Sequence, residues 1–171
     1  MRRAQRMIGM TAVLLLAVGV AATQAQPQLA GTWVLDPAQS QFPTHGGRGP
    51  DAQAAPPAVT LVVEQQGNVL KATRTMARGN RAHSMSETYV ADRTDQVHPG
   101  RHGSTVTRAA FDGDRLVVTG THTMKNEQGD KTMTRESIWT LSPDGKILTI
   151  DTTMQTPHGT RNIKSVYYLR G

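Results

Sequence analysis

Apolar and polar residues alternate along most of the chain between residues 58 and 170. Val59, Leu61 and Val63 take every second position in one segment, and Leu116, Val118 and Gly120 do so in another. Neighbouring side chains of a strand point to opposite faces, so a period of two predicts β-strands with one buried face. The i, i+3, i+4, i+7 spacing of an amphipathic helix does not occur in this region. We predict nine strands, over 31–36, 58–66, 69–77, 83–91, 104–112, 115–124, 130–142, 147–156 and 160–170.

Six compact turns, nearly all with a central Gly, separate these segments after residue 58. They are Gln66-Gly67-Asn68, Arg78-Gly79-Asn80, Asp112-Gly113-Asp114, Gln128-Gly129-Asp130, Pro143-Asp144-Gly145 and Pro157-His158-Gly159. Such turns supply the positive φ angles of tight hairpins, so consecutive strands must be antiparallel neighbours. We therefore predict an all-β, up-and-down antiparallel meander of about eight to nine strands, closed into a barrel or clam that hides its edges.

The alternation also assigns faces. Leu148, Ile150 and Met154 share one face of their strand, and Ile163, Tyr167 and Leu169 share one face of the last strand. Each set is expected to point into a common interior. Trp33 and Trp139 are expected there too, with Leu35 and Leu141.

Two longer connections interrupt the hairpins, at 43–57 and 92–103. The first is rich in Pro, Gly and Ala, and the second carries several charged residues and two His. Long loops in compact domains are either functional or disordered. For 43–57 we expect a flexible loop, with a mobile flap over the barrel mouth as the alternative.

The N-terminus is typical of an export signal. Arg2, Arg3 and Arg6 precede an apolar stretch over 7–22, and Thr23-Gln24-Ala25 places small residues before a cleavage point at Gln26. The alternative, a retained membrane anchor, is disfavoured because the stretch is short for a bilayer. We therefore expect residues 1–25 to be a signal peptide, residues 26–171 to be one domain, and the protein to be periplasmic or secreted, without stable membrane insertion after cleavage.

The charge and the absence of cysteine limit the kinds of partner and covalent link that the protein can have. Three basic residues lie in the predicted signal, so the formal charge of +6 falls to +3 on cleavage. The remaining charges are scattered, which favours a solvated exterior over a nucleic-acid surface. The chain has no Cys, hence no disulfide, lipid-anchored thiol or thiolate ligand.

Several motifs resemble small secreted lipocalin-like β-barrel proteins of bacteria, most of them uncharacterised. They are Gly31-Thr32-Trp33 with Leu35-Asp36 and Ser40-Gln41-Phe42, the run from Phe111 to Thr119, the run from Trp139 to Lys146, and Val166-Tyr167-Tyr168. The resemblance implies a lipocalin-like barrel or clam more firmly than an activity. It also implies that Trp33 packs at the closed barrel end against an Arg of a late strand, Arg161 or Arg170.

Some residues with inward parity are polar. Arg135 shares parity with Trp139, Arg74 shares parity with Leu70, and Tyr89 lies on the fourth predicted strand. A buried Arg needs a partner, so these side chains either orient the carboxylate or carbonyl of a ligand or lie outside or at the rim. The candidate ligand-binding residues are Trp33, Arg74, Tyr89, Arg135 and Trp139.

No catalytic, cofactor or metal signature is found. The chain lacks a Gly-x-Ser-x-Gly elbow, a His-Glu-x-x-His motif and a phosphate-binding Gly-rich loop before a helix. The His residues show no ligand spacing. Met76, Met85, Met124, Met133 and Met154 fall within strands but do not cluster along the sequence as copper ligands would, so we interpret them as core or pocket lining.

The function that these patterns favour is binding of a small apolar or amphipathic ligand without catalysis. The alternative is a solid-cored interaction module of the cell envelope, whose loops 43–57 and 92–103 contact an unidentified protein. An enzyme would need converging acid, base or metal-ligand side chains, which the sequence does not reveal.

Overall fold

Ten antiparallel strands form a single sheet in the computed structural model, which describes residues 26–41, 57–100, 103–125 and 129–171. The strand order is β4-β3-β2-β1-β10-β9-β8-β7-β6-β5, so every consecutive pair except β4 and β5 is hydrogen-bonded, and β1 also pairs with β10. The strands are β1 (Gly31–Leu35), β2 (Ala58–Gln66), β3 (Val69–Arg78), β4 (Arg81–Val90), β5 (Asp92–Gly100), β6 (Gly103–Asp112), β7 (Arg115–Met124), β8 (Lys131–Leu141), β9 (Ile147–Thr156) and β10 (Gly159–Leu169).

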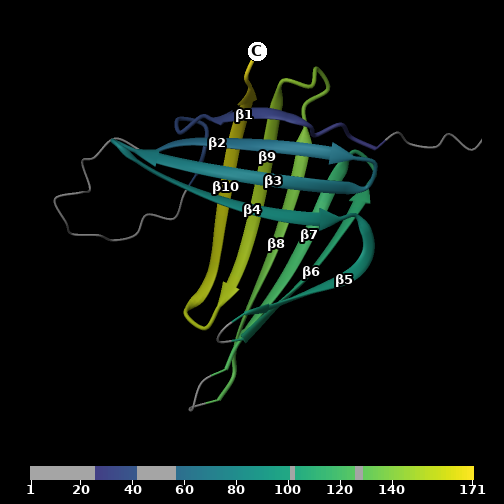
Figure 1. Ribbon diagram of the computed structural model, residues 1–171, viewed down its shortest axis with the longest axis vertical. Helices are drawn as coiled ribbons and strands as arrows, with labels where there is room; N and C mark the ends of the chain where they lie inside the picture. The colour runs from purple at the N-terminus through teal and green to yellow at the C-terminus, as the bar shows by residue number, and fades with distance from the viewer. Residues whose placement is uncertain (1–25, 42–56, 101–102, 126–128) are drawn as a thin grey trace, which may run out of the picture.

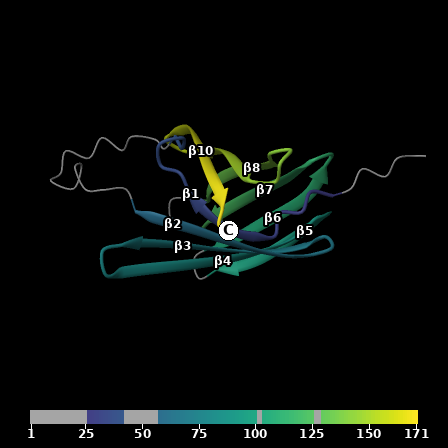
Figure 2. The same ribbon diagram turned by 90° about the horizontal axis from the view of Figure 1, so that it is seen from above.

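The sheet wraps into two halves that cross each other. In Figure 1, β1 to β4 run across the long axis of the molecule and β7 to β10 run roughly along it. Figure 2 shows β3 and β4 on one side and β7, β8 and β10 on the other. The two free edges, β4 and β5, do not pair, although β4 approaches β6. The fold class predicted from the sequence is therefore confirmed, as a nearly closed barrel that is split between β4 and β5.

The backbone confirms the predicted turns, except that the turn over 128–130 lies partly outside the described residues. All six turn glycines have positive φ, which only Gly adopts without steric cost. They are Gly67, Gly79, Gly113, Gly129, Gly145 and Gly159. All nine predicted strands are present, with ends that shift by at most two residues.

The prediction of a loop over 92–103 was wrong, because residues 92–100 form β5, a strand in addition to the nine predicted ones. The sequence hid this strand because it lies at an edge of the sheet, where polar residues and Pro99 are tolerated. Asp92 accepts hydrogen bonds from the backbone and hydroxyl of Thr94, and Arg93 has a φ of 68°. This tight corner carries the chain from β4 on one half to β5 on the other.

The inward faces pack as predicted at one end of the barrel. Trp33, Leu61, Leu116, Leu148 and Tyr167 are almost completely buried there, as is Leu29 from the segment before β1. Gln65 holds that segment by accepting from the Leu29 N–H (2.7 Å) and donating to the Pro27 carbonyl (3.1 Å). Leu35 and Leu141 pack half-buried against this core.

One residue with inward parity, Leu169, is exposed although it lies opposite the buried Trp33. Leu169 is 43% exposed, because it ends β10 at the rim, where its side chain extends past the core and lies over Gly31.

Two predictions lie outside the described residues. The signal peptide over 1–25 and nearly all of the loop over 43–57 fall in segments that the structure does not describe. Among the described residues there is no helix, and so none that could cross a membrane.

Candidate functional site

The inward face of the barrel changes from buried to accessible along its length. On β8, Trp139 and Ser137 are buried, Arg135 and Met133 are half-buried, and Lys131 is exposed. On β3, the buried Leu70 and Ala72 give way to the exposed Arg74 and Met76, and β9 changes in the same way. One half of the interior is therefore filled by apolar side chains, and the other half is open to solvent.

Three adjoining cavities occupy the open half, and all three are lined by Glu87 and Arg135. Their volumes are about 420, 220 and 130 Å³. The largest has a polar wall of His98, Thr105 and Thr107, the second is lined by His122, Met133 and Met154 among others, and the third by Arg74, Tyr89 and Trp139 among others.

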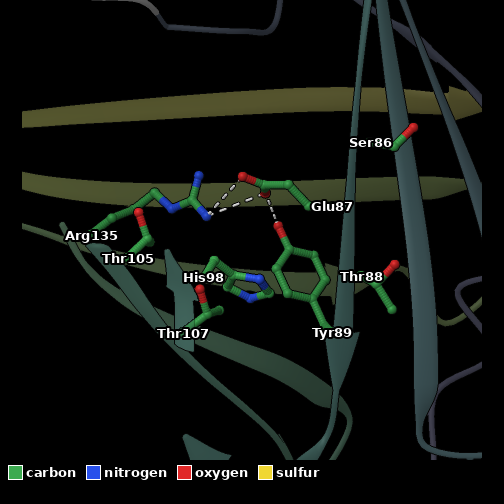
Figure 3. Close-up of a pocket in the computed structure, with 8 residues that line it drawn as sticks. All are labelled: Ser86, Glu87, Thr88, Tyr89, His98, Thr105, Thr107 and Arg135. Atoms are coloured by element: carbon green, nitrogen blue, oxygen red, sulfur yellow. Dashed lines mark hydrogen bonds and ion pairs between the residues drawn. The ribbon is translucent and has the colours of Figure 1, made fainter. Parts of the chain in front are cut away.

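A charged group crosses the interior where the filled half meets the open half. Arg135 of β8 donates to Glu87 of β4, with Nη2 3.3 Å from Oε2 and 3.5 Å from Oε1. The Tyr89 hydroxyl donates to the same Glu87 Oε2, and Figure 3 shows the three side chains converging between the two halves. Side chains alternate between the two faces of a strand, so Glu87 and Tyr89, two residues apart on β4, share its inward face.

The pKa values of this group follow from burial and charge. Burial would raise the pKa of Glu87, but the hydrogen bond from Tyr89 and the charge of Arg135 outweigh it, so the pKa of this carboxyl is lowered. Burial and the neighbouring carboxylate raise the pKa of the Tyr89 hydroxyl. Burial would lower the pKa of Arg135, but the charge of Glu87 raises it. At neutral pH the group is therefore an ion pair with a protonated Tyr.

Arg74 adds a second positive charge on the same side of the barrel. It lines the 130 Å³ cavity, and its charge acts on both Glu87 and Tyr89. Within the described part of the chain it makes no hydrogen bond or ion pair, while Glu87 is engaged by Arg135. The cavity therefore carries one positive charge more than its carboxylate neutralises.

An aromatic pair forms the floor of the site. Tyr89 and Trp139 meet edge to face, with ring centroids 6.1 Å apart and an interplanar angle of 77°. Such contacts stabilise beyond simple burial. The Trp139 Nε1 is buried and has no hydrogen-bond partner among the described residues.

The structure brings together four of the five residues predicted to bind a ligand. Arg74, Tyr89, Arg135 and Trp139 line one cavity. Trp33 lies apart in the filled half, where its Nε1 donates to the Leu29 carbonyl at 3.0 Å. Arg161 lies at the opposite end of β10 from Leu169, the residue that pairs with Trp33, so it is not the late-strand Arg beside that indole.

Sequence reasoning missed several residues of the site. Glu87 has the same parity as Tyr89, and this signal was available. His98 belongs to the unpredicted strand β5. His122 has no ligand spacing in the sequence, but it is half-buried in the structure, and its Nδ1 lies 2.8 Å from the Thr105 Oγ1.

Glu87 is poorly suited to act as a general base. A general base needs a pKa near the working pH, whereas that of Glu87 is lowered by its partners. In the described part of the chain, no three His, Asp or Glu side chains gather so as to hold a metal ion.

Comparison with known proteins gives the fold. No family model matches the chain, and no curated protein matches its sequence. The zebrafish ileal bile acid-binding protein complexed with cholic acid is similar in structure, with a TM-score of 0.51 and 14% identity over 83% of this chain and 98% of that chain. Secretory abundant heat soluble protein 4 from Ramazzottius varieornatus has a TM-score of 0.51 and 11% identity, over 84% of this chain and 95% of that chain. At these identities the likeness shows the fold alone, an antiparallel β-barrel like theirs.

Proposed function

We propose that this protein binds one small amphipathic molecule in the open half of the barrel, without transforming it. The apolar part of the ligand would lie against Met133, Met154 and the Tyr89–Trp139 pair, and its polar end would meet Arg74 and Arg135. The zebrafish protein of the same fold was solved with cholic acid, which supports a barrel of this kind holding a small molecule.

The observation that carries the proposal is the uncompensated charge beside the hollow. Glu87 neutralises Arg135, and Arg74 remains without an ion-pair partner among the described residues, next to apolar side chains. A ligand with a single negative charge, such as a monocarboxylate, would complete this balance and accept charge-assisted hydrogen bonds from the guanidinium group. A barrel filled throughout, the alternative expected from the sequence, does not fit three adjoining cavities.

Binding can be tested with three probes of one chain length: a fatty acid, the corresponding alcohol and the corresponding amine. We expect saturable binding in the order acid, alcohol, amine. Arg74→Gln is expected to weaken binding of the acid by about tenfold while leaving the alcohol unchanged. The matched control is Lys71→Gln, which removes a cation from the outward face of the same strand, where Lys71 pairs with Glu64. Failure of all three probes, or equal affinity for acid and amine, would contradict the proposal.

We also propose that the protein acts outside the cytoplasm, in the periplasm or in the surrounding medium. The Arg-rich start, apolar stretch and small residues before Gln26 support this. Expression of the full chain in a bacterial host followed by fractionation and N-terminal sequencing tests it. The expected product begins at Gln26 and is found outside the cytoplasm, and an uncleaved cytoplasmic product would refute the idea.

A further inference from the structure

Two methionines and one histidine face the same cavity from three successive strands. His122 of β7, Met133 of β8 and Met154 of β9 all line the 220 Å³ cavity in the open half. The spacing of the methionines along the sequence shows no cluster, so this gathering arises only when the strands pair.

The strand register places the three residues near one another on the inward face of the sheet. His122 lies directly opposite Met133, and Met154 lies opposite Arg135, two residues along β8 from Met133. Adjacent strands are about 4.8 Å apart, so the outer two of these strands are separated by about 10 Å, and all three side chains converge from one inward face.

Hydrogen bonding prepares the imidazole to act as a ligand. The Nδ1 of His122 lies 2.8 Å from the Thr105 Oγ1, which accepts a hydrogen bond from Nδ1–H in the tautomer that carries its proton there. With the proton held at Nδ1, the lone pair of Nε2 is available for a metal, and this is how a neighbouring group usually sets the tautomer of a metal-binding His.

The donor atoms of these three side chains determine which metal ion they favour. Thioether sulfur is a soft donor that favours Cu(I) and ions like it, whereas Mg²⁺ and Ca²⁺ require oxygen ligands. Two thioethers and a neutral imidazole carry no charge, and the one carboxylate lining this cavity, Glu87, is paired with Arg135. A divalent cation would therefore add two uncompensated charges beside Arg135, whereas a monovalent soft ion adds one.

We propose that this cavity binds one soft monovalent cation, Cu(I) or Ag(I), through the Sδ atoms of Met133 and Met154 and the Nε2 of His122. The cation does not require the amphipathic ligand proposed above, although that ligand would contact the same Met133 and Met154. Ag(I) is the suitable first probe, because it does not change oxidation state during the experiment.

The test is a titration of the full chain, labelled with ¹³C at the methionine methyl groups, with Ag(I) and separately with Zn²⁺. We expect the Met133 and Met154 signals to shift and saturate at one Ag(I) per site, with Met85 unaffected and no response to Zn²⁺. Cu(I), added under anaerobic conditions, should shift the same two signals. If neither signal shifts, or if all methionines respond alike, the proposal is overturned.

Variants separate ligation from packing. Met133→Leu and Met154→Leu conserve volume, so the circular-dichroism spectrum should stay that of the wild type. The affinity for Ag(I) should fall by about 10- to 100-fold or more, because loss of a residue that only hydrogen-bonds to a metal ligand already costs that much. Met85→Leu, on β4 and outside this cavity, is the matched control and should bind Ag(I) normally. Thr105→Val should weaken binding and Thr105→Ser should restore it, because Ser keeps the hydroxyl. Unchanged affinity in both Met variants would refute ligation.

Discussion

Glu87 and Arg135 form an ion pair across the barrel interior, although their strands β4 and β8 are far apart in the order of the sheet. The Arg135 Nη2 lies 3.3 Å from the Glu87 Oε2, and the hydroxyl of Tyr89 donates to the same oxygen. Since β4 is a free edge, this contact links the edge to the opposite half where no backbone hydrogen bonds do so. The pair therefore contributes to holding the split barrel together as well as to shaping the cavity.

Glu87→Gln should destabilise the fold. The substitution leaves the half-buried guanidinium of Arg135 without its counter-charge. We expect the free energy of unfolding in urea to fall by about 1 kcal/mol, more than an exposed pair contributes and less than a fully buried one. Glu64→Gln is the control, since it breaks the exposed Glu64–Lys71 pair and should cost almost nothing. Equal losses in the two variants would show that Glu87 has no special role.

The stabilisation from Glu87 should depend on pH in one direction. The pKa of this carboxyl in the folded protein is lowered from its ordinary value of 4.5, so its contribution is complete above that value. As the pH falls further, the unfolded state takes up the proton first, and the contribution is lost as the pH passes through the lowered pKa of the native state. The measurement is the difference in unfolding free energy between the wild type and Glu87→Gln from pH 7 to pH 2. A difference that grows toward acid would contradict this assignment.

The two tryptophans should respond differently to the same substitution. Trp33→Phe removes the donor to the buried Leu29 carbonyl, whereas Trp139→Phe removes a buried N–H that has no partner in the described part of the chain. Both changes remove similar apolar surface, so the difference reports the hydrogen bond. We expect Trp33→Phe to be more destabilising by about 1–3 kcal/mol in denaturant unfolding. If Trp139→Phe is the more costly change, the indole N–H of Trp139 has a partner.

Most of the fold could be predicted because hairpins are local. Apolar residues at every second position identify a strand from its own sequence, and a short Gly-containing segment identifies a tight turn from two or three residues. Nine strands and their pairing order could therefore be predicted. β5 was not predicted, because an edge strand needs no apolar face and so shows no alternation of apolar and polar residues. Its His98 and Gln96 alternate with exposed charged and apolar residues, without a pattern that distinguishes strand from loop.

The site was harder to predict because it is assembled across the barrel. Parity placed Arg135 and Arg74 inward, and Tyr89 was a candidate on the fourth predicted strand, but nothing local shows that β4 and β8 meet. The partner of Arg135 could therefore not be named, even though Glu87 had the right parity. The same holds for Met133, Met154 and His122, which are neighbours through the register of β7, β8 and β9.

Gly120 offers a way to fill the cavity without disturbing the fold. A Cβ at this position would meet its nearest atoms at 3.9 Å (Arg135 Nε) and 4.0 Å (Val106 carbonyl oxygen), and both are ordinary contacts. Glycine within a strand is destabilising, so Gly120→Ala should raise the free energy of unfolding by about 0.5–1 kcal/mol. Gly120→Leu should project into the 220 Å³ cavity and weaken binding of the fatty-acid probe while the protein stays folded. Thr119→Leu places the same side chain on the exposed outward face of β7 and should leave probe binding unchanged. If Gly120→Leu binds the probe as tightly as the wild type does, the probe does not occupy the 220 Å³ cavity.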